Sequence, residues 1–157
     1  MIEQISTFFN SEMIYLWLNL GILPFWFILI FFPQSRICNF FVTSIFPFLI
    51  LGSIYIYLIY QLIISEYNFL SNFDLYLGLD ELSGLLTDTS LLIIFWLHYI
   101  SINLFCGSWI VRDSQKFMIS KILIFFPLII TYFAGPVGIL IYWLIRIFFA
   151  KRISLYD

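Results

Sequence analysis

The sequence has very few charged residues. Charged side chains make up 10% of its 157 residues, whereas hydrophobic residues make up 63%. Soluble domains carry about 25% charged residues, and an apolar surface of this extent would associate in water. The scarcity of charge therefore excludes a water-soluble domain and indicates an integral membrane protein.

Basic residues, cysteine and histidine are also scarce. Seven Lys and Arg stand against nine Asp and Glu, a net charge of −2. No basic stripe could neutralise phosphates, which excludes nucleic acid as a partner. Cys38 and Cys106 form no CxxC motif, and His98 is the only histidine. We therefore expect no metal site and no cofactor. The N-terminus has acidic but no basic residues, so a cleavable signal peptide is not expected either.

Long apolar runs dominate the rest of the chain. A helix that crosses the ~30 Å hydrocarbon core needs about 20 predominantly apolar residues. Four runs bracketed by charged residues meet this requirement: 13–32, 38–64, 91–111 and 122–149. We predict an all-α fold, with residues 1–157 forming a single membrane domain that is a four-helix bundle.

The stretch between the second and third runs, residues 66–89, predicts a short interfacial amphipathic segment. It mixes acidic residues with Leu, Phe and Tyr and contains no Lys or Arg. This composition is typical of a helix that lies on the membrane surface, and residues 80–86 suit one such helix.

The basic residues predict the orientation, because Lys and Arg concentrate on the cytoplasmic side. Four lie in or beside the two short loops of one face: Arg36, Arg112, Lys116 and Lys121. Lys151 and Arg152 fall on the other face, and Arg146 is expected to snorkel to the interface there. We expect the first set to face the cytoplasm or stroma, and both termini to face the opposite side.

His98 lies inside the third apolar run, where a polar side chain must face protein, water or a ligand. Three explanations stay open: a hydrogen bond to another helix, a proton donor or acceptor in a buried site, or a haem or metal ligand. The last is the least favoured, because a single His supplies too few ligands. Asn103 points to another face of the same helix, so we expect this helix to lie inside the bundle.

Other polar and small residues have structural explanations. Asp88 is expected to cap the start of the third helix. Arg112 and Asp113 suggest a local ion pair or an interface anchor. The run Gly135-Pro136-Val137-Gly138 predicts either a kink or a close approach of a neighbouring helix or a ligand.

The pattern of these residues resembles the abscisic-acid-deficient-four family. The third run carries Trp96-x-His98-Tyr99, followed by Asn103-Leu104-Phe105, and it ends at Arg112-Asp113. The fourth run carries Gly135-Pro136-Val137-Gly138. Leu23-Pro24-x-Trp26 matches the first helix of the family, and the resemblance covers residues 23–144. The family usually has Asp where this chain has Asn103.

This resemblance implies a carotenoid ligand, because plant members are required to make neoxanthin from violaxanthin. The reaction would open an epoxide to an allene, and needs an acid and a base but no cofactor. His98 is the candidate acid or base, with Arg112 and Asp88 as assistants. The candidate ligand-lining residues are Trp96, Tyr99, Asn103, Trp109, Gly135 and Pro136. The resemblance also implies a bacterial inner, thylakoid or plastid membrane.

The alternative function is a non-catalytic small membrane subunit that binds pigment, lipid or a protein partner. A small permease is less favoured, because the spans contain no paired carboxylates. The expected partners are membrane lipid and a carotenoid, and a second copy of the chain or another membrane protein is a further candidate.

Overall fold

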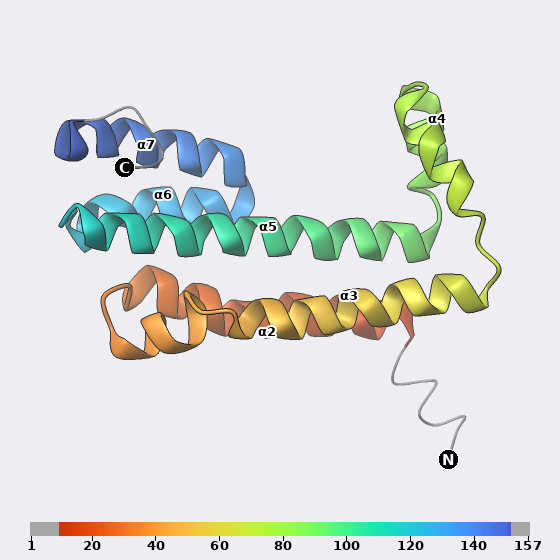
Figure 1. Ribbon diagram of the computed structural model, residues 1–157, viewed down its shortest axis with the longest axis horizontal. Helices are drawn as coiled ribbons and strands as arrows, with labels where there is room; N and C mark the ends of the chain where they lie inside the picture. Colours follow the sequence, from red (N-terminus) through yellow and green to blue (C-terminus); the bar gives the residue numbers. More distant parts are fainter. Residues whose placement is uncertain (1–9, 152–157) are drawn as a thin grey trace, which may run out of the picture. The chain divides into compact units, whose positions relative to one another are not determined.

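The computed structural model describes residues 10–151, apart from the side chains of Asp74 and Leu75, and all their regular structure is helical (Figure 1). The α-helices in this range are α2 (Ser11–Phe31), α3 (Phe46–Ile64), α4 (Leu79–Leu85), α5 (Thr89–Lys116), α6 (Lys121–Phe133) and α7 (Gly135–Ala150). A π-helical turn, η1 (Cys38–Val42), and a 3-10 helix, η2 (Phe69–Tyr76), complete the set. The predicted all-α fold is confirmed.

Three segments are long and apolar enough to cross a membrane: Ser11–Phe31, Cys38–Ile64 and Thr89–Lys116. They correspond to the first three predicted spans. The second contains η1 and a short break before α3 begins at Phe46. The third extends beyond the predicted apolar run, because the helix continues through polar residues to Lys116.

The predicted fourth span over residues 122–149 is wrong, and with it the four-helix bundle. This run contains two helices, α6 of 13 residues and α7 of 16. Each is shorter than the ~20 residues that a crossing needs. The break lies at Ala134, whose φ of −147° and ψ of 74° are not helical. Pro136 lies in the first turn of α7, where its missing N–H costs no helical hydrogen bond.

Contacts divide the chain into two units. Among the described residues, unit 1 comprises 10–20 and 49–99, and unit 2 comprises 21–48 and 100–151. The helices α2, α3 and α5 each supply residues to both units. Acidic and basic residues are distributed unequally between the two units. Unit 1 holds six acidic and no basic described residues, whereas unit 2 holds six basic residues and one acidic residue, Asp113.

In unit 2, α6 and α7 pack against each other as a helical hairpin (Figure 1). Two contacts fix the direction of α7. Gly135 at its start lies against Asn103, near the middle of α5, and Arg146 near its end bonds to Asp113 near the end of α5. The helix α7 therefore runs parallel to the second half of α5.

This direction corrects the predicted orientation. Because α6 runs back along α5 and α7 returns, Lys151 lies at the same end of unit 2 as Lys116 and Lys121 (Figure 1). Lys151 was expected on the opposite face. That expectation assumed that residues 122–149 cross the membrane once, and two short helices do not.

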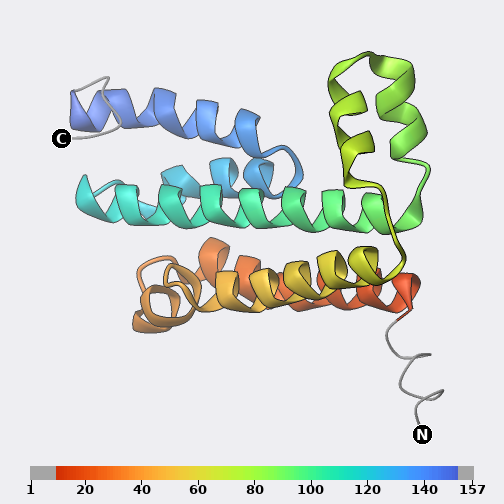
Figure 2. The same ribbon diagram turned by 45° about the vertical axis from the view of Figure 1, so that its right-hand side comes forward.

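In unit 1, the acidic connector folds into η2 and α4, which pack together (Figure 2). The helix predicted over residues 80–86 is present as α4 (Leu79–Leu85). Several large apolar side chains of the connector are exposed: Leu70, Phe73, Tyr76, Leu77 and Leu79. Such a surface fits an interfacial segment, and its contact with a membrane stays a prediction.

The cores of both units consist mainly of branched aliphatic side chains. In unit 1 the buried residues include Ile14, Leu18, Leu58, Leu62, Ile93 and Leu97. In unit 2 they include Leu29, Leu104, Ile110, Val111, Leu128 and Tyr142. The half of α5 in unit 2 also buries Asn103, Ser108, Asp113 and Ser114, so polar groups enter that core.

Candidate functional site

Asp88 caps the first turn of α5. Its Oδ1 accepts hydrogen bonds from the backbone N–H groups of Ser90, at 2.8 Å, and Leu91, at 3.2 Å. The first N–H groups of a helix have no partner within the helix, so a carboxylate here stabilises its start. The predicted cap is confirmed, and the catalytic role of Asp88 stays a prediction.

Aromatic side chains from α2 and α5 form a wall in unit 1, which we call the aromatic wall: Tyr15, Trp96 and Tyr99. The rings of Trp96 and Tyr99 stack with 5.3 Å between their centroids, and the Tyr15 ring lies 5.9 Å from that of Trp96. The indole N–H of Trp96 donates a 3.3 Å hydrogen bond to Oδ1 of Asn19. Sequence reasoning identified Trp96 and Tyr99 but missed Tyr15 and Asn19, which come from a distant part of the chain.

Among its described residues, unit 1 contains two cavities, of which the first lies beside the aromatic wall. The first has a volume of about 450 Å³ and is lined by Ser11, Glu12, Tyr15, Thr89, Leu92, Ile93 and Trp96. The second, of about 440 Å³, shares Ser11 and Ile93 and adds the polar side chains of Asn10, Tyr57, Gln61, Ser65 and Ser90. Both volumes lie in the range of small-molecule sites, about 300–1,000 Å³. Unit 1 thus holds an aromatic recess and a polar one, and the two share the lining residues Ser11 and Ile93.

His98 has an exposed side chain on α5. Within residues 10–151 the imidazole has no hydrogen-bond partner. The helix–helix hydrogen bond that could have explained His98 is therefore not made in the described part of the chain. An exposed imidazole in an apolar run is open to lipid or to a ligand.

Asn103 lies against the turn between α6 and α7. Its side-chain amide donates a 3.3 Å hydrogen bond to the carbonyl oxygen of Tyr132, and the residue is buried. A Cβ on Gly135 would collide with the Asn103 carboxamide. A side chain at this position would therefore displace the Asn103 carboxamide from its place against the turn. The predicted close approach of a neighbouring helix at Gly135 is confirmed.

Gly138 brings α6 and α7 together one turn later. A Cβ at this position would lie 2.5 Å from the backbone nitrogen of Thr131 and 2.7 Å from the carbonyl oxygen of Pro127. Because both neighbours are backbone atoms, neither can rotate away. Small residues at such contacts let helices pack closely in an apolar environment.

A buried ionic cluster of three side chains joins α5 to α7. Oδ2 of Asp113 accepts hydrogen bonds from Nε of Arg146, at 2.7 Å, and from the hydroxyl of Tyr142, at 2.6 Å. Arg146 is only 2% exposed and Asp113 9%. The guanidinium also lies 4.7 Å from the centre of the Phe117 ring. A charge this deeply buried needs a paired and hydrogen-bonded partner, which the cluster supplies.

The cluster corrects two expectations. Within the described residues, the ion pair of Asp113 is with Arg146 and not with its neighbour Arg112. Arg146 is buried and does not snorkel to an interface. Sequence reasoning missed the pair because its members lie 33 residues apart. A signal was present, since an arginine inside an apolar run favours an acidic partner, and Asp113 is the one acid among the described residues of unit 2.

The other predicted site residues do not gather into one centre. Asp88 and His98 are separated by about 15 Å along α5. Arg112 and Pro136 are exposed, and Trp109 packs its ring edge-on against Tyr142, with 5.6 Å between centroids. Among the described residues, no three His, Cys, Asp or Glu side chains lie close enough to hold a metal ion.

Comparison with known proteins identifies a family. Residues 13–142 match the ABA4-like family, described as ABA DEFICIENT 4-like. No curated protein and no solved structure matches the chain. The matched region includes the aromatic wall, the whole of α5 and the helical hairpin as far as Tyr142. The resemblance seen in the sequence is confirmed, and the chain belongs to the ABA DEFICIENT 4-like family.

Proposed function

We propose that this protein binds a carotenoid in the bilayer along the aromatic wall of unit 1, and opens the epoxide of a xanthophyll by isomerisation. The observation that carries the proposal is an aromatic recess and a polar recess that share two lining residues. A xanthophyll is a stiff polyene with polar end rings, so its binding site must combine flat apolar contacts with hydrogen-bonding groups. Family membership favours the same ligand class.

In this proposal the two recesses receive different parts of the ligand. Tyr15 and Trp96 contact the polyene, because their rings offer a large and rigid apolar surface. The hydroxylated end ring lies in the second cavity, near Gln61 and Ser65. Both residues are close to the end of α3, at Ile64, where a polar ring would meet the membrane surface.

His98 is the proposed acid–base residue. The reaction breaks a C–O bond of the epoxide and a C–H bond, and it forms an O–H bond and a new C=C bond. One proton leaves carbon and one reaches oxygen, so the reaction has no net redox change. An imidazole can both accept and donate a proton, so one residue can act in both steps. His98 lies about 100° around α5 from Tyr99 and lines neither cavity. The proposal therefore places the second end ring of the ligand outside the two recesses, at this imidazole.

The second candidate function is a carotenoid-holding subunit without chemistry. Asn103 favours it, because the family usually has Asp at this position and an amide cannot donate a proton as an acid. In this chain the Asn103 amide instead bonds to the carbonyl oxygen of Tyr132. Arg112 and Asp88 are weaker candidates for assistance, since Arg112 belongs to unit 2 and Asp88 already caps α5.

The test is expression of the full chain in a bacterial host that accumulates violaxanthin, followed by pigment extraction and chromatography. We expect an allenic product of unchanged mass. His98→Gln should retain the pigment but abolish conversion, because glutamine keeps hydrogen bonding and cannot titrate. Trp96→Leu should lower the amount of pigment that co-purifies, since it removes the centre of the aromatic wall.

The outcomes separate the candidates. Unchanged violaxanthin that co-purifies with the wild type would support the holding subunit. Conversion by Asn103→Asp alone would show that this chain lost the activity with the acid. Conversion that persists in His98→Gln would overturn the role of His98. If the wild type neither converts nor retains the pigment, the carotenoid proposal fails.

A further inference from the structure

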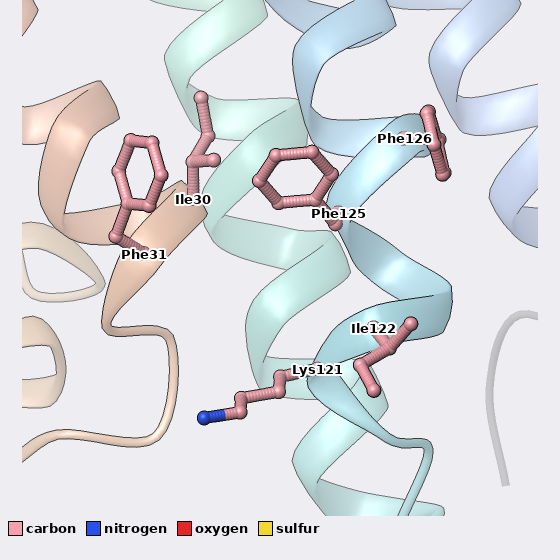
Figure 3. A pocket seen from close by; sticks show the side chains of 6 residues that line it. All are labelled: Ile30, Phe31, Lys121, Ile122, Phe125 and Phe126. Atoms are coloured by element: carbon pink, nitrogen blue, oxygen red, sulfur yellow. The ribbon is translucent and has the colours of Figure 1, made fainter.

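An open groove lies between the end of α2 and the start of α6 in unit 2 (Figure 3). Its volume is about 220 Å³, and it is lined by Ile30, Phe31, Lys121, Ile122, Phe125 and Phe126. The rings of Phe31 and Phe125 meet edge to face, with 6.0 Å between their centroids. The groove thus combines five apolar side chains with a single cation.

The apolar walls of this groove are open to the surroundings. Phe31 is 52% exposed, Ile122 73% and Phe126 68%. In a chain that crosses a bilayer, such surface is covered by hydrocarbon, since lipid tails are as apolar as these side chains. An acyl chain is therefore the natural occupant of the groove.

Lys121 supplies a charge at one end of the groove. Figure 3 shows its side chain reaching toward the end of α2, with the amine nitrogen beyond the rings of Phe31 and Phe125. Within residues 10–151 no carboxylate lies within ion-pair distance of this nitrogen. A lysine whose stem runs along apolar surface keeps its ammonium at the polar boundary, where it can bind a headgroup phosphate.

The charge balance of unit 2 selects the headgroup. Its described residues include six basic side chains against one acidic side chain, and that acid, Asp113, is paired with Arg146. Arg36 and Lys116 are exposed and have the same sign as Lys121. Basic pockets between membrane helices attract anionic headgroups more strongly than zwitterionic ones.

We propose that this groove binds an anionic glycerophospholipid. Its phosphate contacts the Lys121 ammonium, and one acyl chain lies against Phe31, Phe125 and Phe126. The proposal does not depend on carotenoid binding, because the groove lies in unit 2 and shares no residue with the aromatic wall.

The test is native mass spectrometry of the full chain in non-ionic detergent. The protein is titrated with phosphatidylglycerol and, separately, with phosphatidylcholine that has the same acyl chains. We expect phosphatidylglycerol to bind more tightly. Lys121→Gln should weaken its binding about fivefold and leave phosphatidylcholine unchanged, as loss of one lysine near the headgroup predicts.

Lys116→Gln is the matched control. It removes the same charge from the same unit but does not line the groove, so it should leave the preference for phosphatidylglycerol intact. Phe126→Asn should weaken both lipids, and its exposed position keeps the fold intact. Equal binding of both lipids by the wild type, or an equal loss in the two lysine variants, would overturn the proposal. Displacement of phosphatidylglycerol by excess inorganic phosphate would overturn it too, by assigning the site to the free anion.

Discussion

The guanidinium of Arg146 on α7 lies 2.7 Å from the carboxylate of Asp113 on α5, and both side chains are buried. This ion pair holds the end of α7, while the contact between Gly135 and Asn103 holds its start. The helical hairpin is therefore anchored to α5 at both ends of α7.

Removal of one partner of the ion pair should destabilise the protein strongly. Arg146→Met leaves the Asp113 carboxylate buried without its cation, and loss of one member of a buried pair costs about 3–5 kcal/mol. The free energy of unfolding can be measured by denaturant titration in detergent. Arg112→Met is the control, because Arg112 is the exposed neighbour of Asp113. An Arg146→Met variant as stable as the wild type would show that the pair contributes nothing.

Gly138→Ala should destabilise the helical hairpin. The added methyl group would overlap backbone atoms of Thr131 and Pro127, which cannot move without displacing α6. Overpacking of this kind costs about 1–3 kcal/mol. Gly21→Ala is the matched control, since a Cβ there meets no atom within 4 Å and alanine is the better helix former. The midpoint temperature of thermal unfolding should therefore fall in Gly138→Ala but not in Gly21→Ala.

The hairpin should enter and leave the membrane on one side. Single cysteines placed by Lys116→Cys and Lys151→Cys should react with a membrane-impermeant maleimide from the same side, and one placed by Thr87→Cys from the other. Cys38 and Cys106 are first replaced by serine. If Lys151→Cys reacts from the side of Thr87→Cys, residues 121–150 cross the membrane after all.

Asp88 allows its capping role to be separated from its proposed chemical role. Asp88→Ala should destabilise α5 by about 1 kcal/mol, whereas Asp88→Asn should not, because asparagine caps helices as well as aspartate does. The midpoint temperatures of thermal unfolding of the two variants measure this difference. Carotenoid conversion that is lost in Asp88→Asn, with stability unchanged, would assign chemistry to the carboxylate. Equal conversion in the wild type and Asp88→Asn would restrict Asp88 to the cap.

The spans before α6 could be predicted from the sequence, because charged residues bracket them. Glu12 precedes the first, Arg36 separates the first two, and Asp88 precedes the third. The hairpin could not be found in this way, since both α6 and α7 are apolar and hydropathy does not change between them. The signal was Gly135-Pro136, which a kinked span and a helix start share.

Neighbouring site residues could be predicted from the sequence only where they lie on the same helix. Trp96 and Tyr99 lie three residues apart, so helical periodicity alone brings them together. Tyr15 and Arg146 had to be placed by tertiary packing, which a single sequence does not reveal. His98 was expected inside a bundle, and its side chain is exposed instead.

The short helices also constrain how the protein is made. Neither α6 nor α7 is long enough to enter a bilayer as an independent crossing. The turn between them also relies on α5, because the Tyr132 carbonyl oxygen accepts its hydrogen bond from Asn103. We expect these helices to dock onto an α5 that is already inserted, with Asn103 receiving the turn. Folding would then follow the order of translation. A chain arrested before Arg146 is synthesised would lack the ion pair with Asp113 that holds the end of α7 against α5.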